Sequence, residues 1–292
     1  AAPPAANAGP RRARILLAED HHVNQEVALA MLGNLGYSAD VAQNGQEAVA
    51  KWETHPVDLI LMDCQMPVMD GYTATRSIRA REAQTGRART PIVALTANAV
   101  TGDREKCLAA GMDDYLSKPF KASQLAPMLE QWLPVELHAG AMAVPAAATV
   151  AASDVRAPAP VTAAPLLAAS ESSAAVIDDQ ALAAIRACQP PGAPSLLDKI
   201  IGLYLKDSPP LIDDLRQAIA GNDAEAVFRG AHALKNISAN LGATQVSELS
   251  RQLESMGRAG DVSRAGPLLS QLERDHALAA ERLKSVRSEN AG

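Results

Sequence analysis

Five short aliphatic runs alternate with longer amphipathic stretches between residues 14 and 133. The runs are "RILLAE" (14–19), "YSADVA" (37–42), "VDLILM" (57–62), "PIVALT" (91–96) and "DYLSK" (114–118). Such runs are typical of strands in a parallel sheet that is covered on both faces. The stretches between and after them predict helices at about 23–34, 45–54, 71–83, 101–110 and 121–133. The alternation therefore predicts a doubly wound α/β domain with a parallel five-stranded sheet.

A second region, from residue 177 to about 287, has a helical pattern throughout. Gly or Pro separates most of its amphipathic segments, so that "PSLLDKIIGLYLKD" and "PPLIDDLRQAIAGND" are predicted as two helices on either side of Ser208. This region predicts an all-α helical bundle. The stretch between the two regions is rich in Ala and Pro and poor in charge, which is typical of a flexible linker. The predicted order is a linker at 1–13, the α/β domain at 14–133, a flexible linker at 134–176, the bundle at 177–287 and a tail at 288–292.

The composition narrows the class of function. The net charge is −6, which argues against a nucleic-acid binder, because such proteins normally present a basic face. No run reaches the roughly 18 apolar residues of a membrane helix, so direct membrane insertion is not expected. The three cysteines, Cys64, Cys107 and Cys188, are far apart and support neither a disulfide framework nor a zinc site. We therefore expect a cytoplasmic location, either free or as the cytoplasmic part of a membrane-bound protein.

Polar residues close four of the five predicted strands. Glu19 and Asp20 end the first strand, Asp63 the third, Thr96 the fourth and Lys118 the fifth. The carboxyl ends of parallel strands meet at one edge, so these side chains are expected to converge. Three carboxylates in one place suit Mg²⁺, and a lysine with a hydroxyl suits the oxygens of a phosphoryl group. One carboxylate could then serve as the nucleophile that receives this group.

The segments "ILLAEDHHVNQ", "DLILMDCQMPVMDGYTATRSIR", "PIVALTANAV" and "GMDDYLSKPF" resemble the receiver domain of response regulators and hybrid sensor kinases. The resemblance implies a flavodoxin-like fold with strand order 2-1-3-4-5. It implies that Asp63 is the phosphorylated aspartate. Asp20 and Asp63 would bind Mg²⁺ directly, Glu19 would act through water, and the backbone carbonyl of Gln65 would complete the protein ligands.

The same resemblance assigns roles around the phosphoryl group. Lys118 would pair with it, Thr96 would donate a hydrogen bond to it, and Tyr115 would repack when Thr96 moves. The Lys118–Pro119 peptide is expected to be cis. The neighbouring histidines at 21 and 22 are interpreted as variable loop residues above the site.

In the predicted bundle, "AHALKNISANLG" (231–242) predicts a helix that ends at a glycine. His232 falls off the apolar stripe of this helix, with Lys235 as a helical neighbour, so it is predicted to face water. A solvated surface histidine is the simplest interpretation. However, "AHALKNISANLGA" resembles the histidine phosphotransfer module of phosphorelays, in which an exposed histidine accepts phosphate and the lysine supports it. The resemblance implies these roles for His232 and Lys235. Asn236 departs from the family, which often has glycine there.

Taken together, the two resemblances imply a receiver and a phosphotransfer domain of a hybrid histidine kinase. Asp63 would accept a phosphoryl group from a histidine kinase core, and His232 would relay it to the aspartate of a downstream response regulator. The reverse flow, as a phosphate sink, is the alternative, as is a non-catalytic interaction module. An aspartyl phosphatase is disfavoured because Gln65 stands where that class has a second acid. No glycine-rich nucleotide lid is found, so the chain is not expected to be a kinase by itself.

Overall fold

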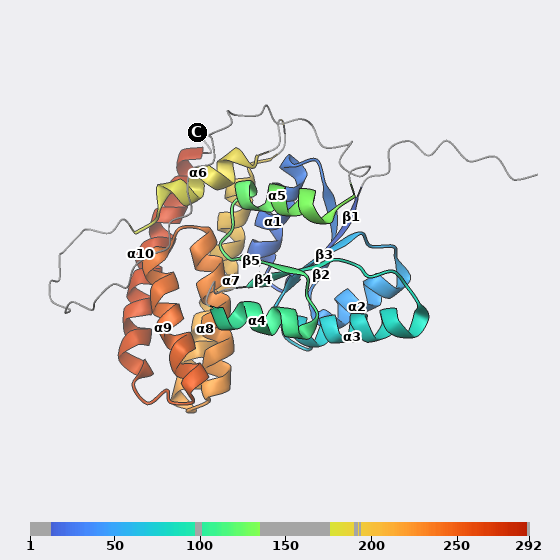
Figure 1. Ribbon diagram of the computed structural model, residues 1–292. Helices are drawn as coiled ribbons and strands as arrows, with labels where there is room; N and C mark the ends of the chain where they lie inside the picture. Colours follow the sequence, from blue (N-terminus) through green and yellow to red (C-terminus); the bar gives the residue numbers. More distant parts are fainter. Residues whose placement is uncertain (1–12, 97–100, 135–175, 190–191, 193, 291–292) are drawn as a thin grey trace, which may run out of the picture.

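The computed structural model describes residues 13–96, 101–134, 176–189, 192 and 194–290, with only the backbone for 101–103 and 290. It contains a sheet domain followed by a helical bundle (Figure 1). The predicted linkers at 1–13 and 134–176 lie largely outside the described residues, whereas residues 288–290 of the predicted tail continue the last helix of the bundle. Their boundaries stay predictions.

The sheet has five parallel strands in the order β2-β1-β3-β4-β5, as predicted. The strands are β1 (Arg14–Ala18), β2 (Ser38–Ala42), β3 (Leu59–Asp63), β4 (Ile92–Thr96) and β5 (Asp114–Ser117). Every residue of β3 and β4 is buried, because helices cover both faces of the sheet. This explains the continuous aliphatic runs in the sequence.

Five helices cover the sheet in two layers (Figure 1). They are α1 (His22–Asn34), α2 (Gly45–Thr54), α3 (Gly71–Thr85), α4 (Thr101–Ala110) and α5 (Ala122–Trp132). α1 and α5 lie on one face, and α2, α3 and α4 lie on the other. The side chains of Asn44 and Asp70 cap α2 and α3 by accepting hydrogen bonds from Glu47 N and Thr73 N. Such caps satisfy backbone donors that have no partner in the first turn.

The C-terminal region is all helical. Its helices are α6 (Asp179–Ala187), α7 (Leu196–Ala220), α8 (Ala224–Asn240), α9 (Thr244–Ala259) and α10 (Ala265–Asn290). The interfaces of α8 with α7 and α9, and those of α10 with α7 and α9, form the bundle. The predicted fold classes of both regions are thus confirmed.

The predicted break in α7 is wrong, since one helix runs through Pro209 and Pro210. Both prolines are exposed, so water can reach the carbonyl groups that they leave without an N–H donor. Ser208 and Ile212 lie on the opposite, buried side of the helix. The apolar stripe therefore continues past the prolines and holds the helix together.

The bundle packs against the sheet domain through α1, which contacts both α7 and α8. Lys199 Nζ donates to Glu26 Oε2 at 2.7 Å, and Asn240 Nδ2 donates to Asn24 Oδ1 at 2.7 Å. Within the described part of the chain, the search for an apolar helix long enough to cross a bilayer found none.

Candidate functional site

Three carboxylates meet at the carboxyl edge of the sheet. Glu19 and Asp20 follow β1, and Asp63 is the last residue of β3. One oxygen from each of the three lies within 4.8 Å of the others, and Glu19 and Asp63 are almost fully buried. The structure thus brings together the acidic residues that the strand-end pattern predicted.

Lys118 is the cation of this cluster. Its Nζ donates to Glu19 Oε2 at 2.5 Å and to Asp63 Oδ2 at 2.6 Å. The side chain reaches the cluster from the end of β5, where the Lys118–Pro119 peptide is cis as expected. One lysine therefore faces three acids.

The imbalance of charge shifts the pKa values of the cluster. The pKa of Asp20 is raised to about 7, first because the carboxyl group is buried and second because the negative charge of Glu19 lies beside it. Burial likewise raises the pKa of Asp63 to about 7, although Lys118 opposes the shift. Burial would also raise the pKa of Glu19, but Lys118 and the amide of Asn24 outweigh it, so this pKa is lowered. The pair of aspartates thus carries the unbalanced negative charge.

The remaining predicted receiver residues lie around Asp63. Thr96 ends β4 and is buried, and Gln65 N donates to Asp63 Oδ1 at 3.1 Å. Among the described residues, Asp20 Oδ1 and Gln65 Oε1 are buried side-chain oxygens without a hydrogen-bond partner. Tyr115 lies in β5, half-buried, with the Arg104 guanidinium 6.0 Å from its ring centroid.

The two histidines after the acidic pair contact other groups. His21 Nε2 lies 3.4 Å from Asp20 Oδ2. His22 Nδ1 lies 4.0 Å from Asp207 Oδ2 of α7, so it takes part in the contact between the domains. The interpretation of His22 as a variable loop residue is wrong, because it is the first residue of α1 and contacts the bundle.

His232 is buried, with 7% of its surface exposed, so the prediction that it faces water is wrong. Its Nδ1 lies 3.0 Å from Glu254 Oε1, and its Nε2 lies 2.9 Å from Asn236 Nδ2. Residues of α9 and of the sheet domain surround the imidazole. Because these residues lie outside α8, the apolar stripe of α8 alone could not predict that His232 is buried.

Glu254 is a residue of the candidate site that sequence reasoning missed. It is 3% exposed and accepts hydrogen bonds from His232, Lys235 Nζ (2.5 Å) and Arg258 Nη2 (3.2 Å). Gly257, one turn later, permits the contact, because a Cβ there would meet Phe228 N of α8 at 2.6 Å. A signal was present: Val246, Ser250, Glu254 and Gly257 follow helical spacing, so the buried stripe of α9 carries a carboxylate.

These bonds fix the state of the imidazole. Burial raises the cost of charge on Glu254, yet the bonds from His232 and Lys235 lower its pKa to about 2, so it is an acceptor only. Nδ1 of His232 must therefore carry the proton, and Nε2 is the unprotonated nitrogen, whose lone pair accepts a hydrogen bond from Asn236 Nδ2. Burial lowers the pKa of His232, which keeps the ring neutral. A neutral imidazole with one defined unprotonated nitrogen is a competent nucleophile.

Asp63 of the acidic cluster and His232 both line one cavity of about 260 Å³. The receiver contributes Asp63, Gln65 and Thr96 to its lining, and the bundle contributes His232 and Glu254. The two predicted phosphoacceptors, which are 169 positions apart in the sequence, thus face the same space.

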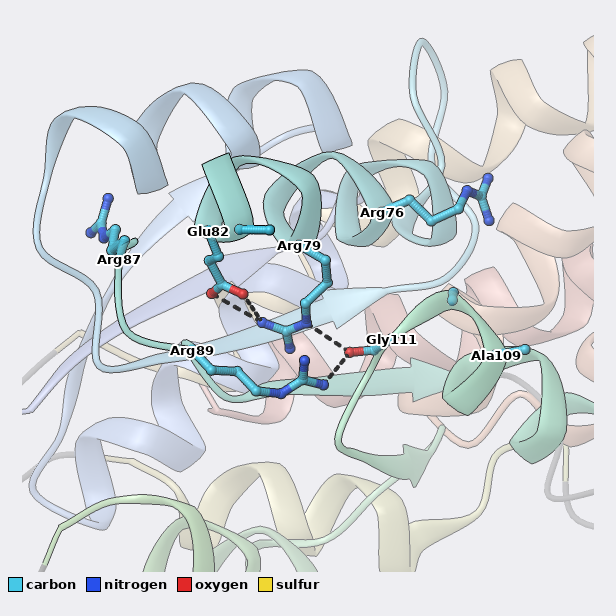
Figure 2. Close-up of a pocket in the computed structure, with 9 residues that line it drawn as sticks. Arg76, Arg79, Glu82, Arg87, Arg89, Ala109 and Gly111 are labelled. Atoms are coloured by element: carbon cyan, nitrogen blue, oxygen red, sulfur yellow. Dashed lines mark hydrogen bonds and ion pairs between the residues drawn. The ribbon is translucent and has the colours of Figure 1, made fainter. Parts of the chain in front are cut away.

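A second cavity, of about 520 Å³, lies at the opposite end of the sheet and is lined by four arginines (Figure 2). Arg79 donates to both oxygens of Glu82, to Gly111 O and to Asp113 Oδ2. Arg89 donates to Asp113 and Gly111 as well. Arg79 therefore ties α3 to the loop before β5, which is a structural role.

Two family models match the chain. Residues 15–130 match the response regulator receiver domain, and residues 199–283 match the Hpt domain.

The curated relatives match through about two fifths of this chain. Hybrid signal transduction histidine kinase G of Dictyostelium discoideum is 45% identical over 127 residues, which are 43% of this chain and 4% of that protein. Sensor protein GacS of Pseudomonas syringae is 39% identical over 128 residues, 44% of this chain and 14% of that protein. The chain thus spans a small part of the length of these relatives.

Two solved structures are also similar. The receiver domain of a sensor histidine kinase from Pseudomonas aeruginosa, with magnesium in its active-site cleft, is 53% identical; the match covers 42% of this chain and 98% of that chain, with a TM-score of 0.38. The complex of the phosphotransfer protein Ypd1 and the Ssk1 receiver domain from Saccharomyces cerevisiae matches at 37% identity, 41% and 88% coverage, and a TM-score of 0.40.

The matches and the architecture lead to one conclusion. A receiver fold precedes a helical Hpt region in a single chain, and the curated relatives are hybrid histidine kinases. The chain therefore carries a response regulator receiver domain followed by an Hpt domain, the two kinds of domain used in phosphorelay signal transduction, and its receiver region is similar to those of hybrid histidine kinases.

Proposed function

We propose that Asp63 and His232 are the two phosphoacceptors of this chain and exchange a phosphoryl group directly. The observation that carries the proposal is the cavity that both residues line. Asp63 would receive the group from the histidine of a kinase core, and His232 would deliver it to the aspartate of a separate response regulator. We assign the receiver domain to residues 14–133 and the Hpt domain to 177–287.

The acidic cluster fits a divalent cation. Asp20 Oδ1 is buried without a hydrogen-bond partner among the described residues, and three carboxylates share one lysine. Such a surplus of oxygen ligands and negative charge suits Mg²⁺. Asp20 and Asp63 would hold the ion directly, with Glu19 through water and the backbone carbonyl of Gln65. When bound, Mg²⁺ neutralises charge on the phosphoryl oxygens.

The residues of the chain divide the chemistry between them. In the transfer to His232, the lone pair of Nε2 forms the P–N bond while the P–O bond to Asp63 breaks and the carboxylate leaves. Lys118 and Thr96 would hold the phosphoryl oxygens on the receiver side. The ring gains positive charge as the bond forms, and Glu254, which accepts from Nδ1, stabilises that charge. Lys235 keeps Glu254 in place.

The roles can be tested with labelled phosphate. The chain is mixed with a phosphorylated kinase core and then treated with acid or with alkali. Histidyl phosphate survives alkali and aspartyl phosphate does not. In the parent chain, we expect alkali-stable label to appear after alkali-labile label. His232→Gln should retain only the labile form, and Asp63→Asn should acquire none from the kinase.

Asp40→Asn serves as the matched control, because Asp40 is an exposed carboxylate in β2 outside the cluster. It should behave as the parent. Alkali-stable label in the His232→Gln variant would contradict the assignment. Release of free phosphate without any histidyl label would instead favour an aspartyl phosphatase. Transfer from a phosphorylated regulator to His232 and on to Asp63 would show that the flow also runs in reverse.

A further inference from the structure

The contact between the domains includes a hydrogen bond that continues into the acidic cluster. Asn24 Nδ2 donates to Glu19 Oε1 at 2.8 Å, and Asn24 Oδ1 accepts from Asn240 Nδ2 of α8 at 2.7 Å. Asn24 is 5% exposed. A chain of two hydrogen bonds thus joins the receiver's acidic cluster to the docked Hpt helix.

The orientation of the Asn24 amide is fixed by its partner. Glu19 Oε1 also accepts from the backbone N–H of His21 at 3.3 Å, so this oxygen is an acceptor and the Asn24 atom beside it must be the amide nitrogen. The other end of the amide, Oδ1, is therefore turned toward α8. The receiver presents a hydrogen-bond acceptor there, and only a donor on the facing helix can satisfy it.

The position of this contact makes it useful for docking. Asn240 lies eight residues after His232 on the same helix, which is about 12 Å along the helix axis. His232 faces the Asp63 cavity, and Asn240 meets Asn24. Contacts at both His232 and Asn240 fix the direction of α8 on the surface of the receiver, whereas a contact at one of them would leave the helix free to rotate about that point.

We propose that Asn24 selects the docking partner of the receiver: it accepts a helix that carries a hydrogen-bond donor at the position of Asn240, eight residues after the phosphoacceptor histidine. In this chain the partner is its own Hpt domain. The proposal rests on the proposed function, since docking has its purpose in transfer between Asp63 and His232.

The ion pairs at this interface are weaker selectors. Lys199 and Glu26 form an ion pair whose side chains are 58% and 26% exposed. Exposed pairs contribute little and are screened by salt. His22 and Asp207 lie at the 4.0 Å limit of an ion pair. The bond between Asn24 and Asn240 joins a buried amide and is not an ion pair, so it should persist at high salt.

The test is a series at position 240 in the full chain. Asn240→Asp offers acceptors only, Asn240→Ala offers neither group, and Asn240→Lys offers donors only. Lys199→Ala is the control for loss of an interface contact. The rate of transfer from Asp63 to His232 is measured after Asp63 is phosphorylated with a small acyl phosphate, and is divided by the amount of phospho-Asp63 present.

We expect a loss of about two- to tenfold for Asn240→Ala, which leaves a buried acceptor unpaired. Asn240→Asp should lose more than tenfold, because two acceptors then face each other. Asn240→Lys should stay within about threefold of the parent. The ratio for the uncharged variant Asn240→Ala should hold at both low and high salt, since it does not depend on ion pairing. Lys199→Ala should change the rate less than Asn240→Ala does.

A second measurement needs no phosphate. Backbone amide exchange in α1 reports docking of the bundle, and we expect faster exchange in Asn240→Asp than in the parent. The inference is overturned if Asn240→Asp keeps the parent's rate and protection, or if the loss in Asn240→Ala disappears at high salt. If no label ever reaches His232 but the exchange difference is seen, the docking inference stands and the proposed relay falls.

Discussion

Gly71 is the first residue of α3 and lies against the backbone of Asp63. A Cβ at this position would lie 2.1 Å from Asp63 O and 2.9 Å from Met62 Cγ. Contacts below 3.0 Å are essentially never seen for a Cβ, and 2.1 Å falls short of that limit by about 0.9 Å. Because the opposing atom is backbone, Gly71→Ala must push the start of α3 away from the end of β3.

The expected cost follows from two opposing effects. Forcing a methyl group into a packed region costs about 1–3 kcal/mol. Alanine returns less than about 1 kcal/mol in helix propensity. We therefore expect Gly71→Ala to lower the free energy of unfolding of the receiver by about 1–2 kcal/mol. Gly33→Ala in α1 is the matched control: a Cβ there meets nothing within 4 Å, so it should stabilise the domain by up to about 1 kcal/mol.

The assay is urea unfolding followed by tryptophan fluorescence. The chain has two tryptophans, Trp52 and Trp132, and both lie in the receiver domain, so the signal reports that domain. Gly71→Ala should also slow phosphorylation of Asp63, because the clash is with the backbone of that residue. A Gly71→Ala variant as stable as Gly33→Ala, or phosphorylated at the parent's rate, would refute this reasoning.

Three further outcomes are expected. Val68→Gly should stabilise the receiver by about 0.5–1 kcal/mol in the same unfolding assay, because Val68 has a φ of 67° and is 80% exposed; equal stability would argue against strain at this turn. Asn236→Ala frees Nε2 of His232 from its hydrogen bond and should accelerate transfer about two- to tenfold in rapid-quench measurements, whereas an unchanged rate would show that the bond does not limit transfer. The pKa of Glu254 is lowered to about 2, so its stabilisation is complete above pH 4.5 and is lost as the pH falls from 4.5 toward 2. Over that range Glu254→Gln should remove about 3 kcal/mol of pH dependence from the unfolding of α8 and α9, followed by NMR, and an unaltered acid titration would contradict it.

The periodicity of the chain predicted the elements of the receiver closely. The helices at 45–54 and 101–110 have the predicted bounds, because capping residues and glycines mark their ends and the helices between strands are amphipathic. The convergence of Glu19, Asp63 and Lys118 also followed from the sequence, since residues at the carboxyl ends of parallel strands share one edge.

What the pattern could not predict depends on contacts between distant segments. Burial of His232 comes from α9 and the receiver, which the projection of a single helix does not include. The role of Glu254 depends on the close approach of α8 and α9 at Gly257. The continuity of α7 depends on which side of the helix Pro209 and Pro210 occupy, and not on their presence alone.

In the proposed relay, the burial of His232 sets an upper limit on how fast the chain can pass phosphate to a regulator. With 7% of its surface exposed, the imidazole has room for one partner at a time, and the chain's own receiver is the partner in contact with it. A regulator from solution must therefore wait until the Hpt domain leaves the receiver. Raising the regulator concentration increases the rate of phosphate transfer to the regulator only until the separation of the Hpt domain from the receiver becomes rate-limiting. The plateau of that saturation curve measures the opening rate of the chain, independently of the regulator used.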